Sequence, residues 1–247
     1  MDKRIETYLV IEIGNTLSKI AIFAGNKLLA VEKHETLTDS ILEEFTQGYG
    51  IDRAIVSNVT NAPDGFSLFK EQGIPLLHFT SKTPIPIENC YQTPDTLGAD
   101  RLALAVAANS LYPNQNVLAI DCGTALTFDF VNCKNQYLGG AISPGISTRF
   151  KALNHFTAKL PLVQFNNDYP LIGTDTTSCI LSGVLNGIIN EVDGYIDAIR
   201  RTYSDVKVVF TGGESFFFDK KLKNTIFVDS NLLLFGLNRI LTHNVSQ

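Results

Sequence analysis

The sequence predicts an α/β protein of two similar lobes, each with a mixed β-sheet flanked by helices. Short apolar runs, which are typical of buried strands, alternate along the chain with longer segments whose apolar residues have helical spacing. The segment at 116–131 also repeats the form of the segment at 8–23: an apolar strand, a turn with an acidic residue and a glycine, and a second apolar strand. Alternating strands and helices with a repeated beginning favour two mixed sheets over an all-β fold.

The repeat sets the predicted domain boundaries. Aligning Glu12 with Asp121 also aligns the glycine and hydroxyl residues of the two turns. Because this shift is about half of the 247 residues, we infer an internal duplication with lobes at 1–113 and 114–247. We expect the lobes to meet around a cleft lined by both turns.

In the first lobe, the strands at 8–23 are expected to be joined at Gly14-Asn15, because Gly and Asn tolerate a positive φ. A helix after His34 has Thr38 or Asp39 as its cap. The further expected elements are a strand at 27–31, a helix at 38–45, a strand at 54–59, a helix at 66–72, a strand at 76–79, a Pro-rich loop at 83–95 and an Ala- and Leu-rich helix at 100–111.

The second lobe is expected to continue after its two strands with a glycine-rich turn at 139–145 and a long helix from Ile146. The remaining expected elements are a polar loop at 161–170, a helix at 176–203, a strand at 207–210 leading into Thr211-Gly212-Gly213-Glu214, and a closing helix at 232–241. The glycine turn after the strand at 207–210 would let an adenine or a ribose lie against a bare backbone.

The composition excludes several classes of function. The formal net charge is −5 and no long run of Lys or Arg occurs, so a nucleic-acid surface is not expected. No apolar run approaches the ~20 residues that span a bilayer, and the first apolar stretch, broken by Glu12, indicates a strand and no signal peptide. Cys90, Cys122, Cys133 and Cys179 lack metal-site spacing, and we expect reduced, mostly buried thiols in a soluble cytoplasmic protein.

The two acidic-glycine turns could bind phosphate. Backbone N–H groups at a glycine turn approach phosphate oxygens closely, and the carboxylate ahead of the turn could hold Mg²⁺ directly or through water. Either turn taken alone is equally explained as an ordinary hairpin bend. The recurrence of the turn in both half-chains favours the nucleotide interpretation, since sugar kinases, actin and the heat-shock ATPases hold a triphosphate between duplicated hairpins.

The segment ending in Gly98-Ala99-Asp100-Arg101 places a carboxylate and a guanidinium at the start of a helix. Asp100 could accept the proton of a substrate hydroxyl, and Arg101 could bind a substrate carboxylate in bidentate fashion. The alternative is a helix-capping Asp beside a solvated Arg.

Four segments together carry a resemblance to a known family. The residues at 12–16, 91–101, 121–127 and 139–145 match, in order, the motifs of the type III pantothenate kinases. The resemblance covers nearly the whole chain. It implies duplicated actin-like ATPase lobes of the ribonuclease H-like kind, and membership of the acetate-kinase, sugar-kinase, heat-shock-protein and actin superfamily.

The resemblance also implies an activity: ATP-dependent phosphorylation of pantothenate to 4'-phosphopantothenate by in-line transfer, the first step of coenzyme A biosynthesis. The implied cofactors are Mg²⁺ and a monovalent cation, potassium or ammonium. The implied state is a homodimer, with no nucleic-acid or membrane partner.

The implied site residues are carried over by position. The ATP phosphate turn would be Glu12, Ile13, Gly14, Asn15, Thr16, Leu17, Ser18 and Lys19, with Thr124 also touching ATP. Pantothenate would contact Tyr91, Gly98, Ala99, Asp100, Arg101 and Thr176, with Asp100 as the general base. Asp121 would bind the monovalent cation and Glu12 the Mg²⁺ ion.

One position departs from the family pattern. The first turn of the family usually begins with Asp, whereas Glu12 stands here. The additional methylene affects the expected Mg²⁺ geometry more than the family assignment. It is also the only feature that supports a competing hypothesis, a non-catalytic regulatory or binding protein that keeps the kinase fold. A kinase for another small carboxylated alcohol is the third alternative.

Overall fold

A computed structural model gives the structure of the protein and describes residues 4–60 and 65–245. The chain forms two compact units, one of residues 4–111 with 231–245 and one of residues 112–230. Each unit has a mixed β-sheet and helices, as the sequence predicts. The change from the first unit to the second lies close to the predicted boundary after residue 113, but the last helix groups with the first unit.

The first unit has a five-stranded sheet in the order β3-β2-β1-β4-β5. The strands β1, β2 and β3 form an antiparallel meander, and β4 and β5 extend it in parallel. Their bounds are β1 Thr7–Ile13, β2 Ser18–Ala24, β3 Lys27–His34, β4 Arg53–Asn58 and β5 Leu76–His78. Two short elements, the strand β6 Glu88–Asn89 and the 3-10 helix η1 Pro94–Thr96, lie in the Pro-rich segment that was expected to be a loop.

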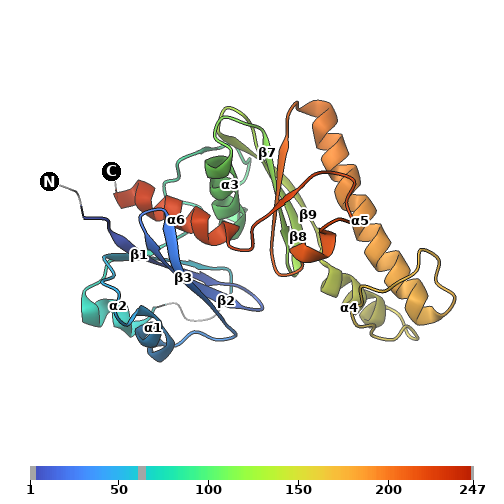
Figure 1. Ribbon diagram of the computed structural model, residues 1–247, viewed down its shortest axis with the longest axis horizontal. Helices are drawn as coiled ribbons and strands as arrows, with labels where there is room; N and C mark the ends of the chain where they lie inside the picture. The colour runs from blue at the N-terminus through green and yellow to red at the C-terminus, as the bar shows by residue number, and fades with distance from the viewer. Residues whose placement is uncertain (1–3, 61–64, 246–247) are drawn as a thin grey trace. The chain divides into compact units, whose positions relative to one another are not determined.

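Helices cover both faces of this sheet (Figure 1). The helices α1 (Asp39–Thr46) and α2 (Ser67–Gln72) bury their apolar residues against one face. The helices α3 (Ala99–Leu111) and α6 (Leu232–Val245) pack on each other, and α6 also packs on β1 and β4. The Thr38 side chain caps α1 by accepting a hydrogen bond from the Ile41 N–H at 3.3 Å, which settles the choice between the two predicted caps.

The second unit repeats the topology of the first. Its strands are β7 Val117–Cys122, β8 Ala125–Val131, β9 Gln136–Pro144, β10 Lys207–Thr211 and β11 Phe227–Val228. Their order, β9-β8-β7-β10-β11, has the same antiparallel meander and the same two parallel additions as the first sheet. The inferred duplication is therefore present in the fold.

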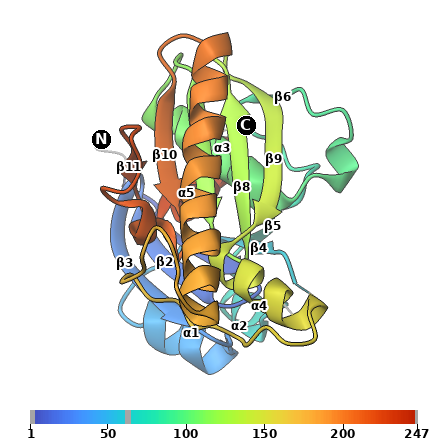
Figure 2. The same cartoon turned by 90° about the vertical axis from the view of Figure 1, so that its right-hand side faces the viewer.

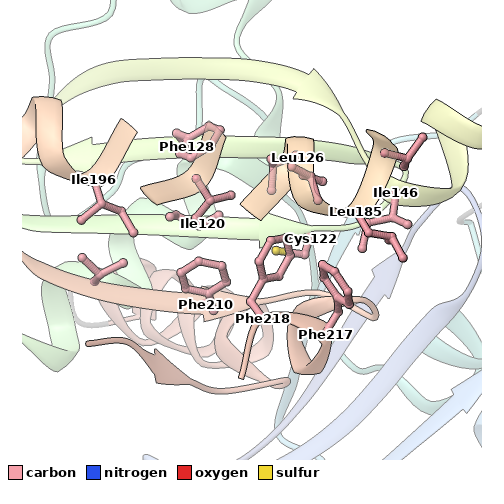
Figure 3. Close-up of a cluster of buried hydrophobic side chains, with 14 of the residues drawn as sticks. Ile120, Cys122, Leu126, Phe128, Ile146, Leu185, Ile196, Phe210, Phe217 and Phe218 are labelled. Carbon is pink, nitrogen blue, oxygen red and sulfur yellow. The ribbon is translucent and has the colours of Figure 1, made fainter. Parts of the chain in front are cut away.

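The helices α4 (Ile146–Phe156) and α5 (Thr176–Thr202) pack on this second sheet, and α5 runs along its face (Figure 2). The 3-10 helix η2 (Ser215–Phe218) follows β10. Figure 3 shows the core between them, where Phe128 of β8, Phe210 of β10 and Phe218 of η2 lie among aliphatic side chains of the sheet and of α5. The buried side chains of this core are apolar, and removal of their surface from water is what holds the sheet, α5 and η2 together.

Three expectations about local structure were wrong. Neither Gly14 nor Asn15 has a positive φ, so their turn is not the tight hairpin that was expected. The segment expected as a glycine-rich turn at 139–145 is mostly strand β9, in which a Cβ on Gly140 would lie 1.5 Å from the Phe128 carbonyl oxygen. Glycine therefore serves close strand packing there. Finally, all four thiols are free, but only Cys122 is buried.

None of the helices in the described ranges is both long enough and apolar enough to cross a bilayer.

Candidate active site

In the first unit, the acidic-glycine turn begins at the end of β1. Glu12 pairs with Lys19 of β2 in the sheet register, and Glu12 Oε2 lies 3.7 Å from Lys19 Nζ. This oxygen is buried, and within the described part of the chain no group donates a hydrogen bond to it. Burial raises the pKa of Glu12, the negative charge of Asp100 raises it further, and Lys19 opposes the shift.

Within the turn, the backbone at Gly14 packs closely against the backbone at Leu17. A Cβ on Gly14 would lie 2.8 Å from the Leu17 carbonyl oxygen, so this position requires glycine. Asn15, Thr16 and Leu17 are exposed, whereas Ile13 and Ser18 are buried at the ends of the two strands. The turn thus presents backbone and small polar groups outward while its ends stay fixed in the sheet.

The Gly98-Ala99-Asp100-Arg101 segment opens α3, as predicted. The Asp100 carboxylate folds back over Gly98, where a Cβ would lie 2.5 Å from Asp100 Oδ1. The same oxygen accepts a hydrogen bond from the Arg101 N–H at 2.9 Å. Glycine at 98 is therefore what allows this carboxylate position, and the charge of Asp100 reaches Glu12 within the same unit.

Arg101 is not the solvated arginine of the alternative interpretation. Its side chain is buried, with 6% of its surface exposed, and its guanidinium lies over the Tyr91 ring at 6.0 Å from the centroid. Sequence reasoning placed both residues in one substrate pocket, and the structure brings them together.

In the second unit, the matching turn lies beside the glycine turn after β10. Gly212 has a φ of 93°, and a Cβ on it would lie 2.3 Å from Asp121 Oδ1 and 2.5 Å from the Cys122 carbonyl oxygen. The Glu214 N–H donates to the same Cys122 carbonyl at 3.0 Å. Burial raises the pKa of the Cys122 thiol well above its usual range, and the charges of Asp121 and Glu214 add to the shift, so the thiol stays neutral.

The start of α4 completes this arrangement. The Thr124 carbonyl accepts hydrogen bonds from the Gly145 N–H at 3.1 Å and the Thr148 hydroxyl at 2.7 Å. The Glu214 carboxylate accepts hydrogen bonds from the backbone N–H groups of Ile146 and Ser147, at 3.1 and 3.3 Å. A carboxylate from another element therefore caps α4, where the helix dipole favours negative charge.

A cavity of about 340 Å³ lies beside this cap, entirely within the second unit. Three phenylalanines contribute to its lining, which consists of Ile146, Phe165, Asn167, Gly213, Glu214, Phe216 and Phe217. Sequence reasoning identified the glycine turn but missed Phe165 and Asn167, which come from the loop between α4 and α5. The three consecutive phenylalanines after Ser215 were the one available signal of an aromatic wall.

One predicted site residue, Thr176, is not joined to these groups. Thr176 is exposed in the first turn of α5, where Asp175 and Ser178 form a capping box, and no hydrogen bond of the described residues links it to the 121–124 turn. No cluster of three metal-ligating side chains occurs in the residues that the structure describes. The buried oxygen of Glu12 suits a Mg²⁺ ion whose other ligands come from phosphate and water.

The chain matches the family model of type III pantothenate kinases over residues 8–198. It is 44% identical to the type III pantothenate kinase of Cytophaga hutchinsonii, over 96% of this chain and 99% of that protein. It is 42% identical to the type III pantothenate kinase of Bacteroides fragilis, over 96% of this chain and 98% of that protein.

Solved structures share the fold at low identity. A Baf family protein from Campylobacter jejuni has a TM-score of 0.63 at 21% identity, covering 97% of this chain and 100% of that one. The activator of the 2-hydroxyisocaproyl-CoA dehydratase from Clostridium difficile, solved with bound ADPNP, has a TM-score of 0.54 at 14% identity, covering 98% and 97%. These neighbours identify the expected actin-like ATPase fold.

The family model covers most of the chain, and the two relatives are more than 40% identical over almost its full length. The chain belongs to the type III pantothenate kinase family.

Proposed function

We propose that Asp100 is the general base in the in-line transfer of the γ-phosphoryl group of ATP to the terminal hydroxyl of pantothenate. Family membership supplies the reaction: the protein is a kinase that phosphorylates pantothenate with ATP, in coenzyme A biosynthesis. The single observation that carries the role of Asp100 is its carboxylate, set at the first turn of α3 over Gly98 and within electrostatic reach of Glu12.

Phosphoryl transfer depends on alignment of the reacting groups and neutralisation of phosphate charge more than on covalent catalysis. Asp100 would orient the hydroxyl and take its proton, while the Glu12–Lys19 turn would hold ATP phosphates through backbone N–H groups and short polar side chains. Lys19 would offset phosphate charge, and the buried oxygen of Glu12 would bind Mg²⁺ directly or through water.

Pantothenate carries a carboxylate at the end opposite its reacting hydroxyl. We assign that carboxylate to Arg101, since a buried guanidinium stacked on Tyr91 is preorganised for bidentate binding. Gly98 and Ala99 would allow close approach of the substrate, and Thr176 would supply a hydroxyl.

In the second unit, Thr124 would touch ATP and Asp121 would hold a monovalent cation, potassium or ammonium. The aromatic cavity beside Glu214 would receive the base of the nucleotide, because its walls are Phe165 and Phe217 and its floor is the bare backbone of Gly213.

We propose further that the protein is a cytoplasmic homodimer. The four free thiols agree with a reducing compartment. Phe156, Leu171 and Ile172 are 81%, 78% and 78% exposed, and large apolar side chains at this exposure are typical of a surface that a partner covers. Light scattering should report twice the monomer mass, and Leu171→Ser with Ile172→Ser should shift the mass toward the monomer.

The test of the catalytic proposal is release of ADP from ATP, Mg²⁺, potassium and pantothenate. We expect Asp100→Asn to lower kcat by about 10²–10⁴-fold, the usual contribution of a general base. ADP binding measured by calorimetry should stay unchanged, which would separate a lost proton acceptor from a misfolded site. Full activity of Asp100→Asn would refute the assignment.

A further inference from the structure

The loop between α4 and α5 supplies two walls of the aromatic cavity, Phe165 and Asn167. Its two ends are tied to the helices: Asn154 of α4 donates to the Leu160 carbonyl at 2.8 Å, and Ser182 of α5 donates to the Leu171 carbonyl at 2.6 Å. Val163 is buried in the core of the unit. The residues at 164–168, which carry both walls, are exposed.

One side chain outside the cavity holds this exposed part of the loop. Lys221, which follows η2, donates from Nζ to Asn167 Oδ1 at 3.1 Å. The same Nζ lies 4.4 Å from the centroid of the Phe217 ring and 5.1 Å from that of the Tyr169 ring. Phe217 in turn meets Phe165 edge to face, with 5.5 Å between centroids and an interplanar angle of 82°.

The contacts of Lys221 also fix which way the Asn167 amide faces. A lysine ammonium has only donors, so the amide must turn its oxygen toward Lys221. The Asn167 NH₂ group is then left to donate. At the wall of an aromatic cavity, such a donor recognises an acceptor atom on a flat ring.

We propose that Lys221 is a positioning residue for nucleotide binding, which fixes the cavity wall of Phe165 and Asn167 and orients the Asn167 NH₂ group as a donor to a ring nitrogen of the purine base. The inference rests on the proposed function, in which this cavity takes the base. Lys221 does not line the cavity itself, so its effect on the ligand passes through Asn167 and Phe217.

The first experiment uses Lys221→Met, which keeps the length of the side chain and removes its charge and donors. The expected result is a rise of about tenfold in the KM for ATP and in the Kd for ADP, from loss of one charged hydrogen bond and two cation–π contacts. The KM for pantothenate should change less than twofold. Lys221→Arg keeps a cation with donors and should recover most of the affinity.

The matched control is Lys220→Met, at the exposed neighbouring position. It removes the same charge one residue away. The KM for ATP, the Kd for ADP and the KM for pantothenate should all stay at their wild-type values. An equal loss in both variants would mean that general charge near the nucleotide is responsible, and it would overturn the proposal.

The second experiment separates the anchor from the donor. Asn167→Asp keeps an acceptor for Lys221 but removes the NH₂ group. Wild-type protein should bind one of the 1-, 3- or 7-deaza forms of ADP more weakly than ADP, because that analogue lacks the nitrogen that accepts the hydrogen bond. Asn167→Asp should bind ADP and that analogue equally. Hydrogen exchange at 163–169 should increase in Lys221→Met and stay at the wild-type level in Asn167→Asp.

The ADP calorimetry, the binding of the deaza analogues and the hydrogen exchange do not require turnover. A wild-type protein that failed to phosphorylate pantothenate would refute the proposed function, whereas the ADP calorimetry would still test Lys221. Unchanged ADP affinity in a folded Lys221→Met protein, or equal binding of all three deaza analogues by the wild type, would refute the inference.

Discussion

At the scale of single residues, burial and the neighbouring Asp100 carboxylate disfavour the charged form of Glu12, and Lys19 offsets part of this effect. The raised pKa of Glu12 means that, between its ordinary pKa and the folded value, the folded state binds more protons than the unfolded state. Stability contributed by this group is therefore present at low pH and is lost as the pH rises through the folded pKa.

We predict that Glu12→Gln is more stable than the wild type at pH 8, because the amide removes a disfavoured buried charge. The gain should disappear as the pH falls below the ordinary carboxyl range, where Glu12 is protonated in both states. Thermal unfolding without nucleotide at several pH values measures the difference. The exposed Glu35→Gln is the control, and a less stable Glu12→Gln protein at pH 8 would contradict the account.

The substitution that stabilises the fold should impair catalysis. We expect Glu12→Gln to lower kcat/KM for MgATP by about 10–100-fold, the usual effect of losing a group that orients a metal or its water. Glu12→Asp restores the carboxylate typical of the family and should lose less than Glu12→Gln. Activity against Mg²⁺ concentration is the measurement, and equal activity of Glu12→Gln and the wild type would exclude a metal role.

At the scale of the elements, Glu214 holds three parts of the second unit together. It follows the Gly212-Gly213 turn, its N–H donates to Cys122, and its carboxylate caps α4 through Ile146 and Ser147. We predict that Glu214→Ala lowers the free energy of unfolding by about 1–2 kcal/mol, the usual value of an N-cap. Urea unfolding measures this loss, and Ser147→Ala, which removes only the hydroxyl donor to Glu214, should cost less.

These elements also show what sequence can predict. Strands β1, β2, β7 and β8 were predicted because alternation and apolar runs determine them locally. The strand β9 was missed because Gly140 has a strand role that depends on its close approach to Phe128, a residue of another strand. The aromatic cavity was missed for the same reason, since Phe165 and Phe217 meet only after folding.

At the scale of the whole molecule, the repeated turn predicted the repeated topology. The alignment of Glu12 with Asp121 corresponds to β1 with β7, and each of these strands is central in its sheet. The placement of the closing helix could not be predicted this way. In chain order α6 follows β11 as α3 follows β5, and the repeat therefore predicts α6 in the second lobe, whereas α6 groups with the first unit. Its partners are α3, β1 and β4, which precede it in the chain by more than a hundred residues.

The packing of α6 on α3 gives the last prediction. A Cβ on Gly236 would lie 2.1 Å from the Ala103 carbonyl oxygen and 3.2 Å from the Ala107 Cβ. The backbone of α6 at Gly236 therefore lies directly against α3. Alanine favours a helix over glycine by about 1 kcal/mol, but overpacking costs about 1–3 kcal/mol or more. Because the nearest neighbour is a backbone carbonyl, which cannot turn away as a side chain can, we expect the clash to exceed the gain and Gly236→Ala to destabilise the protein.

The control is Gly194→Ala on α5, where a Cβ would meet nothing within 4 Å and the position is exposed. There the helix preference acts alone, and the variant should gain up to about 1 kcal/mol. Opposite signs for the same substitution in two helices, measured by urea unfolding, would show that α6 is packed as a structural part of the first unit. A stabilising Gly236→Ala would mean that α6 can move away from α3 at little cost, and that the first unit does not depend on its closing helix.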